Sequence, residues 1–323
     1  MHCELVVPGL FGGAMRKNEA MRFAALELLL ARGRSRAKTS QRLEGWLHEA
    51  FDLGEAPFPA GQLTLLGQGG DPAETRWARA DPVHLRVMRD RLVVVPAEAF
   101  DLAAEEATAL CDALNKHFAG MDFTVAQPRR WCARITEMVE NHPALEAAGK
   151  EPNLPRQAAT LLTEVQMVLH AHPVNEAREA RGEPAVNSVW LWGAGRAARA
   201  GSPWQSVAAD DPAAIGAARL AGARHRALPR SAREWLERLP EEGKHLAVLD
   251  ALRAPLALGR DVQTEKVVLE REWFAPLLAA LRAGRVGMVT LHIPDGAEGL
   301  SFETIRADLR RFWRMPKSIE HYA

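Results

Sequence analysis

Short apolar runs separated by helical patterns constrain the fold of this chain more than any other feature. The runs are rich in β-branched residues, are bounded by Gly, Pro or Asp, and cover residues 4–7, 91–95, 186–192, 245–249 and 285–293. Runs of this kind are typical of buried strands. Helical spacing of apolar residues occurs over 18–32, 101–118, 155–170, 265–282 and 302–313. The alternation predicts an α/β fold with a mainly parallel sheet.

The middle of the chain departs from this alternation. Residues 121–125 and 131–135 are expected to form short strands near the strand at 91–95, which indicates a small α+β insertion. The turn-rich segment NHPALEAAGKEPNLP marks the far boundary of this insertion. We therefore predict a core domain from residues 1–75 and 156–323, interrupted by an inserted α+β domain over residues 76–155.

The charges of the chain balance, with 41 Lys and Arg residues against 41 Asp and Glu residues. No overall field favours nucleic acid or an anionic membrane, so we expect neither as a partner. The three cysteines, Cys3, Cys111 and Cys132, lack the spacing of a metal site or a disulfide framework. Without a signal peptide or an apolar run of membrane-spanning length, the expected location is the cytoplasm.

Two polar stretches contain the candidate binding residues. TRWARADPVHLRVMRDRL, residues 75–92, is rich in arginine, and HPVNEAREARGEPAVNSVWLWGAG, residues 172–195, adds asparagine and further arginine. Because a guanidinium group grips phosphate or carboxylate with two hydrogen bonds, the stretches together could bind a small anion. The opposite interpretation of 75–92 is an exposed loop with solvated arginines. The candidate ligand-binding residues are Arg79, Asp81, His84, Asn175, Arg178 and Asn187.

Three further motifs each have a functional and a structural interpretation. Gly193, Gly195 and Ala198 fit the dinucleotide fingerprint G-x-G-x-x-A, but the following segment, with Gly201 and Pro203, does not continue as a helix, so a strand-ending turn is the favoured interpretation. The pairs His170 with His172 and His292 with Asp295 offer metal-ligand chemistry. Neither pair has further ligands close in sequence, and histidines at the ends of helices or strands are usually structural. No nucleophile elbow, P-loop or H-E-x-x-H helix is present in the sequence.

The C-terminal stretch FETIRADLRRFWR is predicted to form an amphipathic helix with Phe302, Ile305, Leu309 and Phe312 on one stripe. Its arginines could bind an acidic partner, or they could form a solvated face. Together with Trp190, Trp192 and Trp204, this helix is the basis of a third hypothesis, a protein that acts through a partner or dimer surface.

The order of these motifs resembles the archaeal-type cofactor-independent phosphoglycerate mutases. Residues 79–118, with the helix LAAEEATALCDALNKHF, and residues 172–195 are similar to the corresponding family segments. The motifs W-x-R-A-D-P-V-H-L and V-N-S-V-W-L-W-G are most similar to the RPFE-type regulatory proteins of proteobacteria. The resemblance implies an alkaline-phosphatase-like α/β core with an inserted domain. It also implies two divalent metal ions and a serine that carries the phosphoryl group.

The sequence departs from the mutase pattern at the residues that carry catalysis. Pro8 stands before Gly9, where the family has Asp-Gly, and no hydroxyl residue lies between Ser40 and Thr64 to act as nucleophile. RAPLALGRD lacks the histidine of the metal motif, and the last strand ends in LHIPDG. Since a dinuclear site needs several matched carboxylates, the expected site holds no catalytic residue and no metal.

The sequence therefore predicts a cytoplasmic, catalytically degenerate pseudoenzyme of the alkaline phosphatase superfamily. It would act as a regulatory or binding protein that senses a small phosphorylated or carboxylated metabolite and needs no cofactor; a protein partner or a homodimer is a further possibility. The alternative is a divergent phosphoglycerate mutase or phosphatase with two Mn, Mg or Zn ions. Its candidate metal ligands are Asp250, Asp261, His292 and Asp295.

Overall fold

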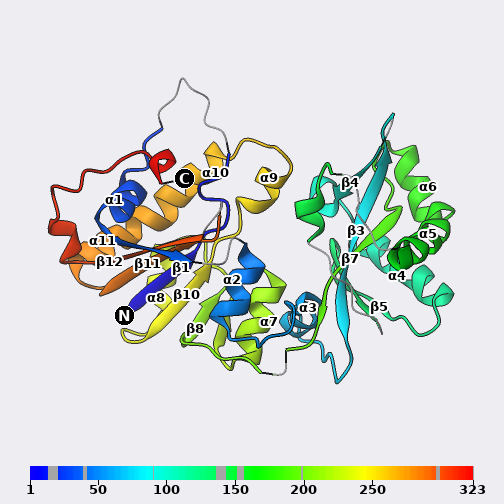
Figure 1. Ribbon diagram of the computed structural model, residues 1–323, viewed down its shortest axis with the longest axis horizontal. Helices are drawn as coiled ribbons and strands as arrows, with labels where there is room; N and C mark the ends of the chain where they lie inside the picture. The colour runs from blue at the N-terminus through cyan, green and yellow to red at the C-terminus, as the bar shows by residue number, and fades with distance from the viewer. Residues whose placement is uncertain are drawn as a thin grey trace. The chain divides into compact units, whose positions relative to one another are not determined.

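The computed structural model describes residues 1–13, 21–38, 42–89, 91–135, 143–150, 156–197, 199–295 and 299–322. The chain folds into two compact units, each with its own sheet (Figure 1). Unit 1 consists of Met1–Asp52 and Arg199–Ala323, and unit 2 consists of Leu53–Ala198.

Unit 1 is built on a seven-stranded sheet in the order β2-β12-β11-β1-β10-β8-β9. Five neighbouring strands are parallel, and β12 and β2 add an antiparallel edge. The mainly parallel α/β sheet predicted from the sequence is thereby confirmed. The strands are β1 (His2–Val6), β2 (Arg34–Lys38), β8 (Ser206–Ala208), β9 (Arg224–Arg226), β10 (Lys244–Val248), β11 (Met288–Ile293) and β12 (Gly299–Ile305).

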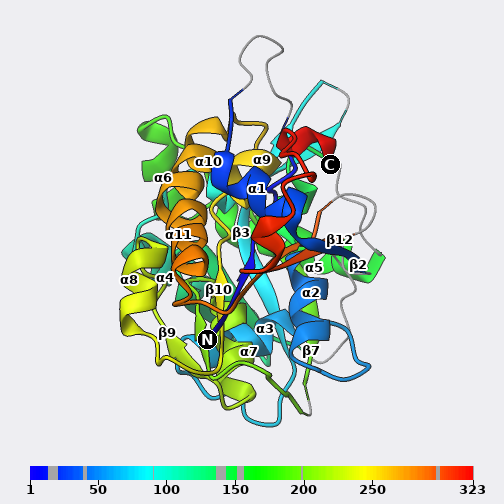
Figure 2. The same ribbon diagram turned by 90° about the vertical axis from the view of Figure 1, so that its left-hand side faces the viewer.

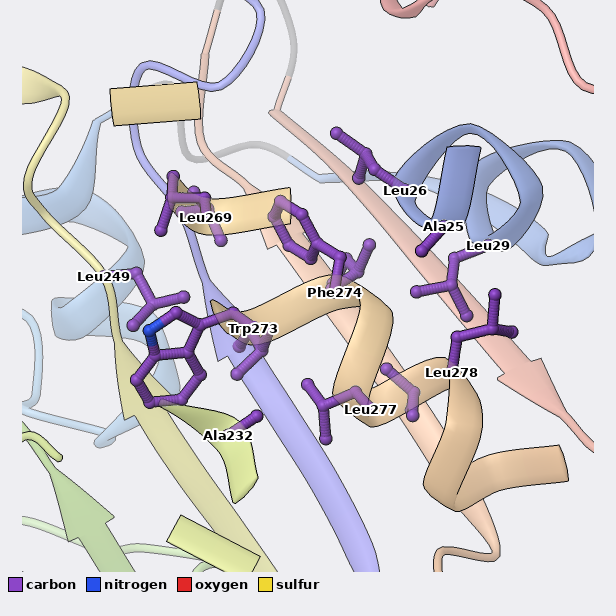
Figure 3. Close-up of a cluster of buried hydrophobic side chains, with 14 of the residues drawn as sticks. Ala25, Leu26, Leu29, Ala232, Leu249, Leu269, Trp273, Phe274, Leu277 and Leu278 are labelled. Carbon is purple, nitrogen blue, oxygen red and sulfur yellow. The ribbon is translucent and has the colours of Figure 1, made fainter. Parts of the chain in front are cut away.

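The helices of unit 1 are α1 (Ala24–Arg32), α2 (Leu43–Ala50), α7 (Pro212–Leu220), α8 (Ala232–Arg238), α9 (Arg253–Ala257), α10 (Gln263–Leu269) and α11 (Ala275–Ala283). A π-helical turn, Glu270–Phe274, joins α10 to α11. Side chains of α1, α8, α10 and α11 form one apolar core with the sheet, as Figure 3 shows for Leu26, Trp273 and Leu277. Because side chains alternate along a strand, Cys3 and Leu5 face this core while Glu4 faces the opposite side of the sheet.

Unit 2 contains a five-stranded antiparallel sheet in which β3 pairs with β4, β6 and β7, and β5 pairs with β6. Its strands are β3 (Trp77–Val87), β4 (Leu92–Pro96), β5 (Phe123–Gln127), β6 (Arg130–Arg134) and β7 (Ser188–Gly195). Its helices are α3 (Ala60–Gly67), α4 (Ala104–His117), α5 (Arg156–His170) and α6 (Pro173–Ala180), and short 3-10 turns cover Ala97–Ala99 and Ala144–Ala147. Figure 2 shows the same ribbon turned by a quarter turn.

The boundary between the two units differs from the predicted boundary. The sequence placed the insertion at residues 76–155, whereas unit 2 runs from Leu53 to Ala198. The reason is tertiary: β7 pairs with β3 along most of its length, and the side chains of α3 and α5 pack into the cores of unit 2. Segments assigned by sequence to the core therefore complete the antiparallel sheet.

The predicted C-terminal helix over residues 302–313 is wrong. Residues Gly299–Ile305 form β12, which pairs with β11 and β2, and a 3-10 turn follows at Asp308–Arg310. Ser301, Phe302 and Thr304 are buried, while Phe312 of the predicted apolar stripe is exposed. Pairing with two strands satisfies the backbone hydrogen bonds on both edges of this segment. This tertiary stabilisation outweighs the local preference for a helix that the spacing of apolar residues indicates.

Three smaller expectations also change. Residues 75–92 do not form an exposed loop, because Trp77–Val87 is the central strand of unit 2. Gly193 and Gly195 lie within β7 rather than at a helix start, so the dinucleotide interpretation is wrong. The helix expected over residues 101–118 begins at Ala104, where the Glu106 carboxylate accepts the Ala103 N–H. Among the described residues, no helix is long and apolar enough to cross a membrane.

Candidate functional site

Arg79 and Asp81, the first two candidate residues, form a buried ion pair on β3. The Arg79 Nε donates to Asp81 Oδ1 at 2.9 Å, and the guanidinium lies 5.4 Å from the ring of Trp192. The Trp192 Nε1–H donates to the other carboxylate oxygen of Asp81 at 2.7 Å. Both charged residues are less than a tenth exposed. The pair thus faces α3 and the tryptophans of β7, and each Asp81 oxygen accepts a hydrogen bond from within the protein.

Asn175 and Arg178 lie on α6 and tie this helix to the chain around it. The Asn175 side chain donates to the carbonyls of Leu169 and Val186 and accepts the Val186 N–H. Arg178 donates to the Pro184 carbonyl at 2.9 Å and to the Glu106 carboxylate at 2.6 Å, and its guanidinium lies over the ring of Phe100. Both residues are buried, and these contacts are those of structural side chains.

His84 and Asn187 connect β3 to the chain that enters β7. The ring Nδ1 of His84 lies 2.9 Å from the Ala185 carbonyl oxygen. The Asn187 amide pairs with the backbone of Leu85 in both directions, at 2.7 and 3.0 Å. Burial lowers the pKa of His84, which favours the neutral ring.

The sheet of unit 2 separates the six candidate residues. Along β3, residues 79 and 81 share one face with Val83, which packs with Trp190 and Trp192. His84 belongs to the opposite face, on which Ala80 packs with residues of α4 and α5. The structure therefore brings Arg79 together with Asp81, and Asn175 and Arg178 onto one helix, but it does not gather the six around one point.

A second polar region lies where the parallel strands of unit 1 end. In open α/β sheets the carboxyl edge is the usual place for ligands, because loops from neighbouring strands meet there. Here β1 is followed by Pro8 and Gly9, β8 by Asp210 and Asp211, β10 by Asp250 and β11 by Asp295. The residues after β1, β10 and β11 stand out separately in the sequence, but their common edge follows only from the strand order.

The Asp295 carboxylate occupies the turn after β1. Its two oxygens accept the backbone N–H groups of Gly9 at 2.6 Å and of Phe11 at 3.1 Å. Burial raises the pKa of Asp295, although these amide hydrogen bonds oppose the increase. Lys266, which sequence analysis missed, is buried beside the same turn and donates to the Gly12 carbonyl at 2.8 Å. Burial lowers the pKa of Lys266, and the charge of Asp295 counteracts this effect.

A leucine from α9 covers the same turn. A Cβ placed on Gly9 would lie 2.6 Å from Leu256 Cδ1, and one placed on Gly12 would lie 2.9 Å from the same atom. Gly9 also has a φ of +86°, a conformation that L side chains rarely adopt. A side chain at Gly9 would therefore be strained by this backbone conformation, and the aspartate of an Asp-Gly pair would stand at the position that Pro8 occupies.

The carboxylates after β8 and in α2 have partners of their own. Asp211 caps α7 by accepting the N–H groups of Ala213 and Ala214 at 3.0 Å. Arg253 donates to Glu44 at 2.6 Å. Burial alone would lower the pKa of Arg253, but the charges of Glu44 and Asp211 raise it above its ordinary value. The guanidinium therefore stays charged among these acids.

A third group of polar side chains links the neighbouring strands β1 and β11 under α2. His292 Nε2 lies 2.9 Å from Glu4 Oε2, and His2 Nε2 lies 2.8 Å from Thr290 Oγ1. The ring of Trp46 lies 5.0 Å from the ring of His292. Burial by itself would raise the pKa of Glu4, but the hydrogen bond and charge of His292 outweigh it and lower that pKa. This group is an internal hydrogen-bonded cluster rather than an open site.

The residues present do not fit the two divalent metals that the mutase resemblance implies. Within the described parts of the chain, no group of three His, Cys, Asp or Glu side chains is arranged to hold a metal ion. Both Asp295 oxygens accept amide hydrogens, and Asp261 accepts the Gln263 N–H at 3.0 Å. His292 bonds to Glu4, and His172 Nδ1 accepts the Val174 N–H as the cap of α6.

Comparison with known proteins identifies similar folds. No family model and no curated protein matches the sequence. Among solved structures, a cofactor-independent phosphoglycerate mutase from Thermoplasma acidophilum is 17% identical, with 94% of this chain and 89% of that chain covered and a TM-score of 0.47. The PH0037 protein from Pyrococcus horikoshii is 14% identical, with 94% and 87% covered and a TM-score of 0.57. This chain shares the fold of the Pyrococcus protein.

Proposed function

We propose that this chain is a phosphoglycerate-mutase-like protein that has lost catalysis and acts as an RPFE-type regulatory protein. The motifs at residues 77–85 and 186–193 support this assignment. One observation carries the loss of catalysis. At the turn where the resemblance places a metal-binding Asp-Gly, the Asp295 carboxylate accepts the amides of Gly9 and Phe11, and Leu256 covers the glycines.

The chemistry of phosphoryl transfer supports this proposal. Two metal ions require several carboxylate oxygens free to coordinate them and to balance their charge. Asp295 and Asp211 instead accept backbone hydrogen bonds, and Pro8 offers no oxygen at its side chain. The purified protein is therefore expected to lack mutase activity in the presence of Mn²⁺, Mg²⁺ or Zn²⁺. Turnover with any of these metals would contradict the proposal.

The ligand of the regulatory protein is proposed to be a small phosphorylated or carboxylated metabolite. Arg79 is the candidate residue to test, because its charged planar group is buried beside Asp81 and a ligand anion would have to replace that carboxylate as its partner. Isothermal titration against a panel of phospho-acids tests this, with Arg79→Lys as the variant that keeps the charge and loses the forked donor set. Binding weakened at least about tenfold in Arg79→Lys is expected. No binding of any panel member would end the metabolite-sensor proposal.

A divergent metal-dependent phosphatase or mutase is the second candidate. It is favoured by one observation, the Asp residues that follow three parallel strands at one edge of the sheet. This candidate requires stoichiometric Mn or Zn in the purified protein and hydrolysis of a generic phosphate ester that Asp250→Asn abolishes. Metal analysis and a phosphatase assay decide between the two candidates.

A further inference from the structure

Two strongly exposed aromatic side chains and an exposed methionine lie close together after β12. Phe312, Trp313 and Met315 are 74%, 67% and 70% exposed, and the two rings meet edge to face with centroids 5.3 Å apart. Scattered exposed apolar residues are ordinary on protein surfaces, but three within four positions form a patch. Figure 1 shows this segment at the left edge of unit 1, running from β12 toward the C-terminus.

The backbone that carries these side chains is held against the end of α1. The Arg314 guanidinium donates to the Gly33 carbonyl at 2.8 Å, and Arg32 donates to the Leu309 carbonyl. The buried Asp308 pairs with Arg311 at 2.8 Å and accepts the Ile305 N–H at 3.2 Å. The loop is thus fixed with its apolar side chains outward, which lowers the entropy lost on binding.

Basic residues outnumber acidic residues in the segment of the patch and in β2, although the chain as a whole is neutral. Residues 32–38 contain four basic residues and no acidic residue, and residues 303–317 contain five basic and two acidic residues. The two segments lie together, because β2 pairs with β12 and Arg34 lies 3.9 Å from Asp308. The exposed cations are Arg34, Arg36, Arg306, Arg310, Arg314 and Lys317.

We propose that these six cations, with Phe312, Trp313 and Met315, form a basic–aromatic surface that binds an anionic lipid membrane. Side chains that are two thirds or more exposed project from the protein. Projecting apolar groups suit a fluid interface, which needs no matching groove, whereas a protein partner needs a complementary pocket. Aromatic rings favour the headgroup region, and basic side chains add attraction to anionic lipid. This proposal is independent of the function proposed above.

Vesicle sedimentation with the full chain tests the proposal. Vesicles that contain phosphatidylglycerol are expected to bind the protein at low salt, and vesicles of phosphatidylcholine alone are not. The double variant Phe312→Ser and Trp313→Ser is expected to weaken binding by at least about tenfold, since it removes two inserted side chains. The double variant Arg306→Glu and Arg310→Glu is expected to weaken binding by at least about tenfold and to lower its salt dependence.

Matched controls separate this surface from general effects. Met167→Ser changes an equally exposed apolar side chain on α5, and Arg233→Glu with Arg282→Glu makes the same charge change elsewhere in unit 1. Both controls should bind the anionic vesicles as the unaltered protein does, and circular dichroism should show all variants folded. Absence of binding to anionic vesicles, or equal binding by all variants, would overturn the proposal. Binding to polyglutamate without vesicle binding would overturn it in favour of an acidic protein partner.

Discussion

At the scale of single residues, buried charges in this protein are matched inside the fold. Arg79 and Asp81 illustrate this, since both are buried and the arginine also lies against Trp192. A buried ion pair adds little net stability over an apolar pair, but removing one partner leaves an uncompensated charge. Substitutions at such residues therefore report on folding before they report on ligand binding.

We expect Arg79→Ala to lower the free energy of unfolding by about 3–5 kcal/mol, because Asp81 would stay buried without its partner. Chemical denaturation measures this loss. Arg199→Ala is the control, because Arg199 and Asp52 are 3.4 Å apart on the surface and such pairs contribute about 1 kcal/mol or less. Equal losses in the two variants would show that Arg79 is not a structural charge.

Glu4 is expected to make stability depend on pH in acid. Since His292 holds the pKa of Glu4 below its ordinary 4.5, the folded state binds this proton less readily than the unfolded chain. The stabilisation is present above pH 4.5 and is lost as the pH falls through the folded pKa. Glu4→Gln should therefore flatten the fall in unfolding free energy between about pH 5 and 3, while Glu237→Gln on the surface should not. An unchanged slope in Glu4→Gln would contradict this assignment.

At the scale of elements, close backbone contacts determine which helices pack on which strands. Gly61 lies in α3, where a Cβ would come within 2.5 Å of the backbone of Trp77 and Ala78 in β3. This contact explains how α3 joins unit 2, although sequence analysis assigned it to the core domain.

Gly61→Ala is expected to destabilise the protein by about 1–3 kcal/mol, because the helix must move away from β3. Thermal unfolding measures the effect. Gly201→Ala serves as the control, since its added Cβ would meet its nearest atom, Asp52 Cβ, at 4.0 Å. A Gly61→Ala protein as stable as the control would show that α3 packs less tightly than described.

At the scale of the whole molecule, each unit contains apolar clusters built from its own residues. The two chain crossings lie side by side within unit 1, where Gly201 donates to the Phe51 carbonyl at 2.7 Å. The chain thus leaves unit 1 after Asp52 and returns to it at Arg199 at neighbouring points of unit 1.

Because of this arrangement, replacing residues 53–198 by a short glycine linker is expected to leave unit 1 folded. Its parallel sheet and core are supplied by the residues that remain. Cooperative thermal unfolding followed by circular dichroism checks the result. A soluble product without a cooperative transition would show that unit 1 depends on unit 2.

The zero net charge of the whole chain does not reveal a local concentration of basic residues. The balance of 41 cations and 41 anions led us to expect no membrane partner, but basic residues gather along β2 and the segment after β12. The sequence shows the arginines of both segments, and only the pairing of β2 with β12 brings them together. The same pairing replaced the predicted C-terminal helix and left Phe312 and Trp313 exposed.

The sequence by itself determined the strands and helices that have strong local patterns. The runs that became β1, β10 and β11 are apolar, β-branched and bounded by turn residues, so local chemistry specifies them. The mainly parallel sheet followed from their alternation with helices. The strands β3 and β12 were not predicted. The segment of β3 is rich in polar side chains, and the apolar residues of β12 and of the segment after it are spaced as in a helix.

Tertiary structure decided which polar residues meet. Arg79 and Asn175 both belong to motifs that stand out in the sequence. The strand β3 nevertheless places Arg79 on one face of the sheet of unit 2, whereas α4 and α5 pack on the other face. Asp295 and Gly9 are 286 residues apart, and only the adjacency of β1 and β11 lets the carboxylate close the turn. Local sequence patterns specify the conformation of a segment, whereas long-range strand pairing specifies the neighbours of its side chains.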